Sequence, residues 1–230
     1  MKTITDTDRD FICDINAPCF QLLTREEIEQ VQSSRTQVLF RKGENLTKQG
    51  AFASYVLFIV SGYVKQHIEG EGNNNYNLRI IKPGEFLGLS SVFGRNTFDY
   101  SAVAITETRA FLVEIEVLKK LVTADGKFAF GIMTRYCDQS HELLGNINKL
   151  VYKQMNGRLA ETLLYLSPEE GEENIFSFLS RKDVAEFAGI STESTVKLLK
   201  TFEKDGLIRL QEKEIILVDR NSLKEISKRG

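Results

Sequence analysis

The residues whose types could do chemistry together lie near the end of the chain, in the stretch SRKDVAEFAGISTESTVKLLKTFEKDGLI from Ser180 to Ile208. Its second half has the spacing of a helix of about 100° per residue, with one ordinary apolar face. The opposite face combines a carboxylate, a valine and two lysines, and packing inside a protein core does not explain such a set. The apolar face consists of Thr195, Leu198, Leu199 and Phe202, and the opposite face of Thr192, Glu193, Val196, Lys197 and Lys200.

The segments around these two faces predict a DNA-binding module. Residues 183–188 form a first helix, Gly189 makes a turn, and Ser191 and Thr192 cap the second helix. Gly206 ends that helix by supplying the left-handed residue of a C-cap, and residues 207–218 give two short strands around a polar turn. A helix, a turn with glycine, a second helix and a β-hairpin make up the winged helix-turn-helix arrangement. Its second helix packs one face on the first helix and presents the other to the DNA major groove.

The predicted recognition face carries groups that match base edges. Glu193 can accept a hydrogen bond from a cytosine amine, Lys197 can donate to O6 and N7 of guanine, and Val196 can contact a thymine methyl group. Other members of the predicted DNA-binding set hold phosphates and set the register of the protein on the duplex. The members that hold phosphates are Ser180, Arg181, Ser191 and Lys200, and Lys182 and Thr192 complete the predicted DNA-binding set.

Length and composition predict an ordinary soluble globular protein of two domains. The chain has 230 residues, of which 42% are hydrophobic and 27% charged, and its formal net charge is −2. Residues 178–230 carry 11 Lys and Arg against 9 Asp and Glu, a balance that permits DNA binding there without arguing for it. The start, MKTITDTDRD, has no apolar segment of a signal peptide, and the longest apolar run, YVLFIV, is too short to span a bilayer. The 3 cysteines have no disulfide spacing and favour a reducing compartment, so we expect a cytoplasmic protein.

The region from about residue 20 to residue 115 has the pattern of a small β-barrel or roll. Short runs rich in β-branched and aromatic residues alternate with glycine-bearing turns such as RKGEN and KPGEF. Before them, LLTREEIEQVQSS predicts a short helix with Thr24 as N-cap and Glu27 completing a capping box. The predicted strands are TQVLF, YVLFIV, YVKQHI, YNLRII, SAVAIT and AFLVEI.

A long helix is predicted from about Lys127 to Lys153, and a shorter helix, GRLAETLLYL, follows it and ends at Pro168. A helix longer than the globular average that carries an apolar stripe usually has a partner helix. A second copy of the chain would supply one in a homodimer, and packing against the chain's own β-roll is the alternative. The stripe consists of Ile132, Met133, Tyr136, Leu143, Ile147, Leu150 and Val151.

The stretch LSRKDVAEFAGISTESTVKLLKTFEKDGLI resembles the DNA-binding segment of the CRP/FNR family of bacterial transcription regulators. MNGRLAETLLYL is similar to the helix that begins that domain, and KPGEFLGLSSVF resembles the Gly-rich phosphate-binding segment of the family's β-roll. The resemblance implies an α+β fold with a double-stranded β-roll sensor domain over residues 1–126. A dimerisation helix over 127–154 and a winged helix-turn-helix domain over 155–230 follow. It further implies a homodimer that binds a palindromic promoter site and carries an activating surface for RNA polymerase.

The predicted effector pocket departs from the cyclic-AMP-responsive members of the family. Those members place a Glu where this chain has Leu89, an Arg for the phosphate where Tyr100 stands, and a Thr-Ser pair for adenine at Leu143 and Leu144. A buried phosphate without its arginine would lack a counter-charge, so we expect that cyclic AMP is not the effector. The predicted pocket set is Gly84, Glu85, Leu87, Gly88, Leu89, Tyr100, Ser101, Leu143 and Leu144.

Two uses of such an apolar pocket stay open. The pocket binds a different, less charged ligand, or side chains fill it and the protein binds DNA without a small effector.

The predicted recognition helix departs from its relatives too, because most close relatives carry Arg at the position of Lys197. A lysine keeps the positive charge and loses the two-pronged donor geometry, so we expect a related half-site rather than an identical one.

The oxygen-sensing branch of the family holds an iron–sulfur cluster through four cysteines. Cys13 and Cys19 reproduce one spacing, but Asp10 stands where the preceding cysteine is expected. Cys137 lies on the long helix instead of in the roll, and we expect it to be a buried small hydrophobic residue. We therefore expect no iron–sulfur cluster.

The carbon-monoxide sensors of the family carry a haem-binding histidine just after the glycines of the segment that corresponds to KPGEFLGLSSVF. Ser90 and Ser91 occupy that neighbourhood in this chain. We expect His67 and His141 to be surface or interface residues, and we expect neither haem nor another metal.

Functions of two other classes compete with a DNA-binding regulator. A cupin-type enzyme needs several histidines and a carboxylate inside its barrel, and this chain has 2 histidines far apart in sequence. A Ser-His-Asp order, a P-loop and paired catalytic carboxylates are missing as well, so we expect no catalysis. The other competitor is a ligand-binding β-roll protein that has lost DNA binding. It predicts acidic or bulky residues across the recognition face, where Glu193 is the one acidic residue.

Overall fold

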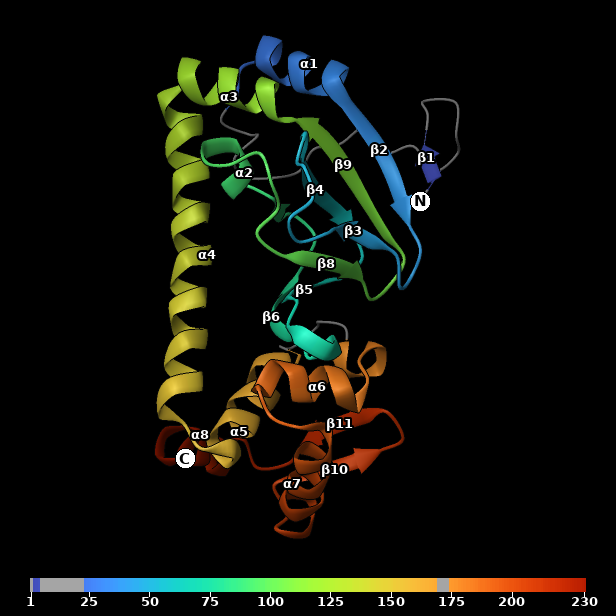
Figure 1. Cartoon of the computed structure of the whole chain (residues 1–230), viewed down its shortest axis with the longest axis vertical. Coiled ribbons are helices and arrows are strands. Elements are labelled where there is room, and N and C mark those ends of the chain that lie inside the picture. The colour runs from blue at the N-terminus through green and yellow to red at the C-terminus, as the bar shows by residue number, and fades with distance from the viewer. Residues whose placement is uncertain (1, 5–22, 169–173) are drawn as a thin grey trace. The chain divides into compact units, whose positions relative to one another are not determined.

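The computed structural model describes residues 2–4, 23–168 and 174–230 of the chain, whose helices and strands are drawn in Figure 1. The described residues form two compact units. The first unit contains the residues up to Glu69 together with Arg79–Glu142, and the second contains Gly70–Leu78 together with Leu143–Gly230. The division into three domains given above stays a prediction.

The first unit is built on two antiparallel sheets (Figure 1). One sheet has 5 strands in the order β1-β2-β9-β4-β7, and the other has 4 strands in the order β3-β8-β5-β6. The predicted α+β fold with a β-roll is therefore confirmed. The first sheet contains β1 (Lys2–Ile4), β2 (Arg35–Phe40), β9 (Thr108–Glu114), β4 (Tyr55–Ser61) and β7 (Phe86–Leu87). The second contains β3 (Asn45–Thr47), β8 (Ser101–Ala104), β5 (Val64–Ile68) and β6 (Tyr76–Ile81).

All six predicted strands are present, as β2, β4, β5, β6, β8 and β9. Helix α1 (Arg25–Ser34) begins as predicted, because Thr24 and Glu27 form both hydrogen bonds of a capping box. Strands β1, β3 and β7 have only two or three residues each, too few to show a two-residue period in the sequence. The sequence reading also missed helix α3 (Ile115–Ala124), the short helix α2 (Ser90–Phe93) and the 3-10 turn η2 (Glu71–Asn73).

Aromatic side chains form the centre of the roll. The ring of Phe58 lies 5.1 Å from that of Phe86 and 6.4 Å from that of Phe111, measured between centroids. Phe128 and Ile132, near the start of helix α4 (Gly126–Tyr152), are buried in the same core. Burial of this apolar surface is the main term that stabilises the unit.

The second unit contains the helix-turn-helix and the hairpin that the sequence predicted. Its residues 180–208 fold as two helices joined at Gly189 and followed by a hairpin (Figure 1). No helix in the described part of the chain is long and apolar enough to cross a membrane. The elements are α5 (Met155–Leu166), η3 (Ile175–Phe178), α6 (Arg181–Ala188), α7 (Thr192–Lys204), β10 (Ile208–Gln211), β11 (Glu214–Leu217) and α8 (Arg220–Arg229).

The turn at Gly189 is closely packed within this unit. Gly189 has a φ of +63°, and a Cβ atom there would lie 2.5 Å from a methyl carbon of Leu150. Only glycine combines this left-handed backbone with so little space. The guanidinium of Arg158 donates to the Gly189 carbonyl at 3.3 Å and to the Leu150 carbonyl at 2.7 Å. The turn is thereby tied to the end of α4.

Residues 70–78, which include the first three residues of β6 and belong to the second unit, contact the first helix of the helix-turn-helix. Asn77 is fully buried, and its side-chain amide donates to the backbone carbonyl of Asp183 at 3.0 Å. Asn146 on α4 donates to the Leu78 carbonyl at 3.0 Å. The sequence analysis assigned these two amides no role, because an asparagine in a strand or a helix gives no local signal of a distant partner.

Lys149 is a buried amine next to the same turn. Its ammonium donates to the Phe187 carbonyl at 2.8 Å and lies 5.8 Å from the centre of the Tyr76 ring. Burial lowers the pKa of Lys149 from 10.5 to about 8, against a smaller opposing effect of Glu161. Burial also raises the pKa of Tyr76 to about 12.

This burial predicts a pH dependence of stability. Between about pH 8 and 10.5 an unfolded Lys149 is protonated and a folded one is neutral, so the unfolded state binds more protons and stability rises with pH. Relative to a Lys149→Met variant, the free energy of unfolding of the wild type should rise by about 3 kcal/mol across this range. Urea unfolding of both proteins at about pH 8 and pH 10.5 measures this rise, and subtraction of the variant's curve removes the titration of all other groups. Parallel pH curves would contradict the assignment.

Candidate nucleic-acid interface and sensor segment

The two helices of the helix-turn-helix begin at well-formed caps. The Ser180 hydroxyl accepts from the Asp183 backbone N–H, and the Asp183 carboxylate accepts from the Ser180 backbone N–H, which is a capping box at the start of α6. The Ser191 hydroxyl accepts from the Ser194 backbone N–H at the start of α7. These caps fix where each helix begins and hence which way its side chains face.

Helix α7 has the two faces that its sequence predicts. Thr195, Leu199 and Phe202 are buried, and Leu198 is partly buried. The predicted recognition face is exposed, which leaves it accessible to a DNA groove. Its exposed members are Ser191, Thr192, Glu193, Val196, Lys197 and Lys200.

Two of the predicted base-reading residues are paired with each other. The Lys197 ammonium lies 2.7 Å from a Glu193 carboxylate oxygen, one helical turn away, and both side chains are more than 70% exposed. A pair this exposed contributes little to stability. Each group can therefore exchange its partner for a base edge at small cost, and the pair holds both side chains on the recognition face.

The members of the predicted DNA-binding set that lie on α6 or at its cap differ in their surroundings. Ser180 is engaged in the cap of α6, and Lys182 lies 3.6 Å from Glu186. Arg181 reaches away from its own helix and donates to the backbone carbonyls of Glu212 and Lys213, each at 3.2 Å. Their roles toward DNA stay predictions.

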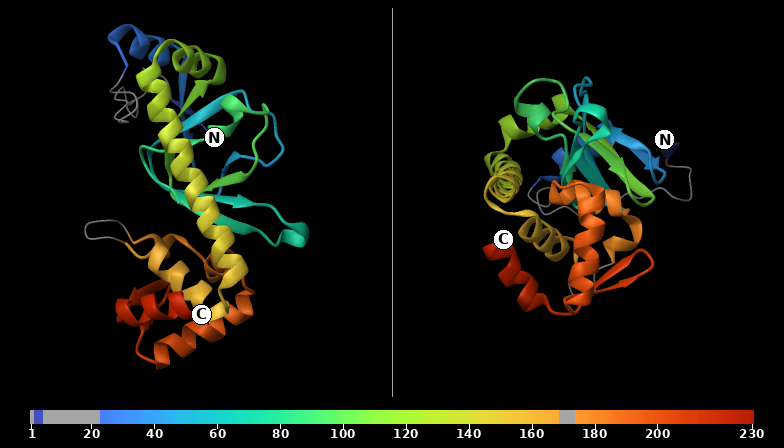
Figure 2. Two further views of the ribbon diagram at one scale, coloured as in Figure 1. Left: turned by 90° about the vertical axis from the view of Figure 1, so that its left-hand side faces the viewer. Right: turned by 60° about the horizontal axis from the view of Figure 1, so that its bottom comes forward.

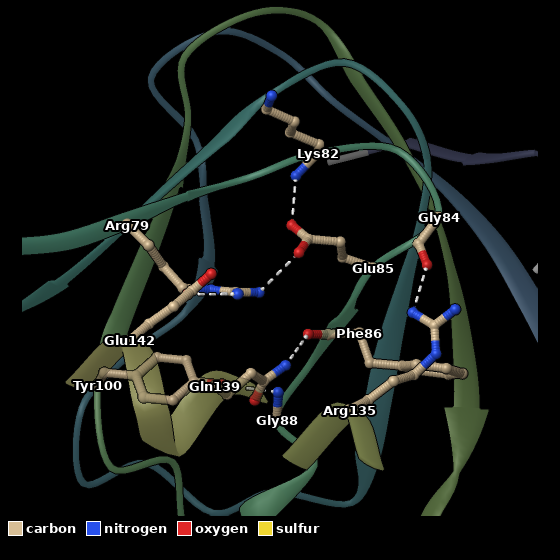
Figure 3. Close-up of polar contacts among 10 residues, drawn as sticks. All are labelled: Arg79, Lys82, Gly84, Glu85, Phe86, Gly88, Tyr100, Arg135, Gln139 and Glu142. Atoms are coloured by element: carbon tan, nitrogen blue, oxygen red, sulfur yellow. Dashed lines mark hydrogen bonds and ion pairs between the residues drawn. The ribbon is translucent and has the colours of Figure 1, made fainter. Parts of the chain in front are cut away.

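The segment that resembles a phosphate-binding loop is occupied by a side chain of the protein itself. Gly88 has a φ of +90°, and its backbone N–H donates to the Tyr100 hydroxyl at 2.8 Å (Figure 3). Leu87 and Leu89 on either side are buried. Burial raises the pKa of Tyr100 above its usual value, so the group is a neutral phenol at neutral pH.

Glu85 of the same segment belongs to a charged cluster that the sequence analysis missed. Figure 3 shows Arg79 between two carboxylates: it lies 3.3 Å from Glu85 and 2.9 Å from Glu142. The other Glu85 oxygen accepts from the Lys82 backbone N–H at 2.7 Å. Arg79 is 8% exposed, so the cluster is a partly buried ion network. A charged residue inside the apolar run YNLRII was the one sequence signal of it.

Two further side chains of α4 contact this segment. Arg135 donates to the Gly84 carbonyl at 3.0 Å, and Gln139 donates to the Phe86 carbonyl at 3.4 Å (Figure 3). Helix α4 therefore makes direct hydrogen bonds to the backbone of residues 84–86. The sequence pattern gave these residues no role because they lie off the apolar stripe.

The remaining predicted pocket residues have other surroundings. The Ser101 hydroxyl donates to the Glu69 carboxylate and accepts from the Gln49 backbone N–H. Leu143 and Leu144 are exposed by 44% and 62%. A common pocket formed by the whole predicted set stays a prediction.

Two expectations about single residues are wrong. Cys137 is exposed on α4 instead of buried, because its position follows the outward face of the helix. His67 is 6% exposed instead of lying at the surface, since β5 turns it inward, whereas His141 is exposed as expected. Cys13 and Cys19 lie outside the described residues. No group of three His, Cys, Asp or Glu side chains within the described ranges is arranged to hold a metal ion.

The β-roll and the winged helix-turn-helix together have the architecture of a two-part DNA-binding regulator. The Crp-like helix-turn-helix domain model matches residues 157–226, and the cyclic nucleotide-binding domain model matches residues 37–125. With the similar proteins described below, these matches show that the chain belongs to the CRP/FNR family of DNA-binding transcription regulators.

Similar proteins cover nearly the whole chain. A CRP-like cAMP-activated global transcriptional regulator of Mycobacterium tuberculosis is 24% identical over 90% of this chain and 95% of its own length. An anaerobic regulatory protein of Bacillus subtilis is 24% identical over 88% of each chain. The solved structure of FixK2 from Bradyrhizobium japonicum has the same fold, with a TM-score of 0.74 at 22% identity over 84% of this chain and 96% of that one.

The exposed position of Lys197 leads to a test of base reading. Lys197→Ala should cost about 1–3 kcal/mol of binding free energy per half-site and relax discrimination at one base pair. Lys200→Ala, which removes a predicted phosphate contact, should instead weaken binding to all sequences about equally. Competition between single-base variants of the half-site measures both effects. Uniform weakening by Lys197→Ala would identify that lysine as a phosphate contact.

Proposed function

We propose that the protein is a homodimeric, sequence-specific DNA-binding transcription regulator of the cytoplasm whose effector is not cyclic AMP. The proposal about the effector depends on one hydrogen bond, in which the Gly88 backbone N–H donates to the Tyr100 hydroxyl. The relatives act as transcription regulators and not as enzymes, and we extend this to the chain. An activating contact with RNA polymerase belongs to the same proposal.

Charged groups around residues 82–93, the segment that resembles a phosphate-binding loop, support the proposal that no cyclic nucleotide binds there. Arg79 lies between the carboxylates of Glu85 and Glu142, and Lys82 and Arg135 are the other cations drawn in Figure 3. The Arg79 guanidinium is thus already engaged by two carboxylates, and it would have to leave them to hold a phosphate. A nucleotide would also have to displace the Tyr100 hydroxyl and leave a buried phenol without its hydrogen bond. Tyr100 thus occupies the segment as an internal substitute for a ligand.

The exposed stripe of α4 supports the homodimer. Side chains along it recur at alternating spacings of three and four residues, which is the heptad pattern of a two-stranded coiled coil. Phe130, Leu144 and Val151 are exposed by 71%, 62% and 63%, and large apolar side chains exposed along one face are typical of an interaction surface. A second copy would cover it. This exposed stripe consists of Phe130, Met133, Cys137, Ser140, Leu144, Ile147 and Val151. It shares Met133, Ile147 and Val151 with the stripe predicted from the sequence, whose member Ile132 is instead buried in the core of the roll.

A selection from random duplex DNA tests the whole proposal. The purified protein alone should retain a two-fold palindrome with half-sites about one helical turn apart, and added cyclic AMP should leave its affinity unchanged. A motif that appears only with cyclic AMP would overturn the effector proposal. Retention of no motif under any condition, including cell extract and absence of oxygen, would favour a ligand-binding protein that has lost DNA binding.

The dimer is tested separately by a charge in the stripe. Leu144→Lys places an ammonium where two copies would meet without water, so the protein should become monomeric and lose the palindrome while keeping its fold. Light scattering measures the mass, and circular dichroism measures the fold. Asn148→Lys adds the same charge to an exposed neighbouring position outside the stripe and should stay dimeric. A dimeric Leu144→Lys protein would place the interface elsewhere.

A further inference from the structure

Two side chains of the kinds that bind metal ions lie one helical turn apart on α4. Cys137 is exposed, and His141, four residues later, is exposed as well. Residues four apart on a helix have their Cβ atoms about 5–6 Å apart, and two ligands at this spacing can hold one metal ion, as the two histidines of zinc proteases do. A thiolate and an imidazole are ligands that zinc prefers. Cys137 and His141 are therefore a candidate for half of a metal site.

One chain supplies too few ligands to complete such a site. Structural zinc sites are almost always tetrahedral with four protein ligands. No group of three His, Cys, Asp or Glu side chains among the described residues is arranged to hold a metal ion. Two further ligands must therefore come from another molecule. Cys137 belongs to the exposed stripe of α4 along which the proposed homodimer would form, so a second copy of the chain would bring the same pair of ligands.

The heptad spacing of the exposed stripe determines how the two pairs would face each other. Phe130, Cys137 and Leu144 take position a of successive heptads, and His141 takes position e beside Cys137. In the left view of Figure 2, α4 faces the viewer as one continuous helix. Its two copies run parallel in the proposed homodimer, because both helix-turn-helix segments follow its C-terminal end and read one palindrome. The a residues then meet across the two-fold axis, and the e residues flank them.

The charged side chains beside this pair favour a cation. Asp138 is exposed and precedes His141 by three residues, a spacing that lets its carboxylate accept from the ring nitrogen that does not bind the ion. Such carboxylates commonly orient a metal-binding histidine. Arg135 precedes Cys137 by two residues and so lies on another side of the helix, where it donates to the Gly84 carbonyl. Its positive charge is therefore directed away from the pair.

We propose that a divalent ion of the zinc type links two copies of the chain and is bound by Cys137 and His141 of each copy. The inference rests on the proposed homodimer and adds a ligand that only the dimer can bind. A ligand of this kind stabilises the state that it binds, so the ion acts as a signal for dimer formation. Each Cys137 binds as a thiolate and releases its proton to water. The sequence-based expectation of no metal took Cys137 to be buried.

Cobalt(II) is a coloured probe for this site, because tetrahedral Co²⁺ with thiolate ligands absorbs visible light strongly. The chain has 3 cysteines, so a full-length Cys13→Ser/Cys19→Ser protein leaves Cys137 as its only thiol. Under a phosphine reductant this protein should take up one Co²⁺ per two chains and develop the absorption of a tetrahedral thiolate complex. Added Zn²⁺ should displace the Co²⁺, since zinc binds such sites more tightly.

Matched variants in the same background identify the ligands. Cys137→Ala and His141→Ala should each abolish the visible absorption. Ser140→Ala changes the next polar residue of the exposed stripe, and Thr134→Ala changes position e of the preceding heptad. Both controls should bind Co²⁺ like the background protein. Binding of one ion per chain, or unchanged absorption in Cys137→Ala, would place the metal elsewhere and overturn the proposal.

Sedimentation with and without Zn²⁺ connects the ion to the dimer. At a free Zn²⁺ concentration of about 100 times its Kd, the dissociation constant of the dimer should fall about a hundredfold, and Cys137→Ala should not respond. A dimer that forms equally without Zn²⁺ and binds no Co²⁺ would overturn the ion and leave the homodimer intact. Wild-type protein that forms a Cys137 disulfide in air but binds no Co²⁺ when reduced would also overturn the ion. A monomer under both conditions would contradict the homodimer itself.

Discussion

The turn between α6 and α7 needs a left-handed residue at a place where a Cβ would press on the Leu150 side chain, and the direction of the recognition helix depends on this constraint. Gly189 takes a left-handed conformation against Leu150, and Arg158 and Lys149 bind the carbonyls of Gly189 and Phe187. The direction in which α7 leaves the turn follows from the backbone angles there. The polar face of α7 is exposed because the turn lets its apolar face pack inward. Burial of the Lys149 ammonium costs free energy, and its hydrogen bond to the Phe187 carbonyl offsets part of that cost.

Arginine side chains make comparable connections elsewhere in the chain. Arg158 binds the carbonyls of Lys153, Leu150 and Gly189, and Arg181 binds those of Glu212 and Lys213. Arg79 binds two carboxylates. The planar guanidinium offers several donors in fixed directions, so one side chain can connect two or three segments that are far apart in sequence. A lysine could replace the charge of each and could not replace the geometry.

In our proposal, the segment of residues 82–93 keeps the fold of the family while its ligand chemistry differs. Gly84 and Gly88 keep the positive φ of a tight loop, and the backbone N–H of Gly88 still points at an oxygen atom. That oxygen belongs to Tyr100 instead of a phosphate. A neutral phenol needs no counter-charge, so the loss of arginine at this place and the surrounding apolar side chains are mutually consistent. The similarity to a cAMP-activated relative therefore extends to the fold of this unit, and our proposal assigns its chemistry differently.

The sequence by itself determined the elements and the class of protein. Periods of two and 3.6 residues, a capping box at Thr24 and a glycine at the turn are local signals, and local backbone physics makes them readable. It also determined that Glu193, Val196 and Lys197 share one face of α7, because helical spacing alone places them there. Only the tertiary structure decided that Arg79 lies between Glu85 and Glu142, that Tyr100 binds Gly88, and that Arg181 reaches the β10–β11 turn. Each of these contacts joins residues that no helix or strand period relates, and their partners become neighbours only when the chain closes on itself.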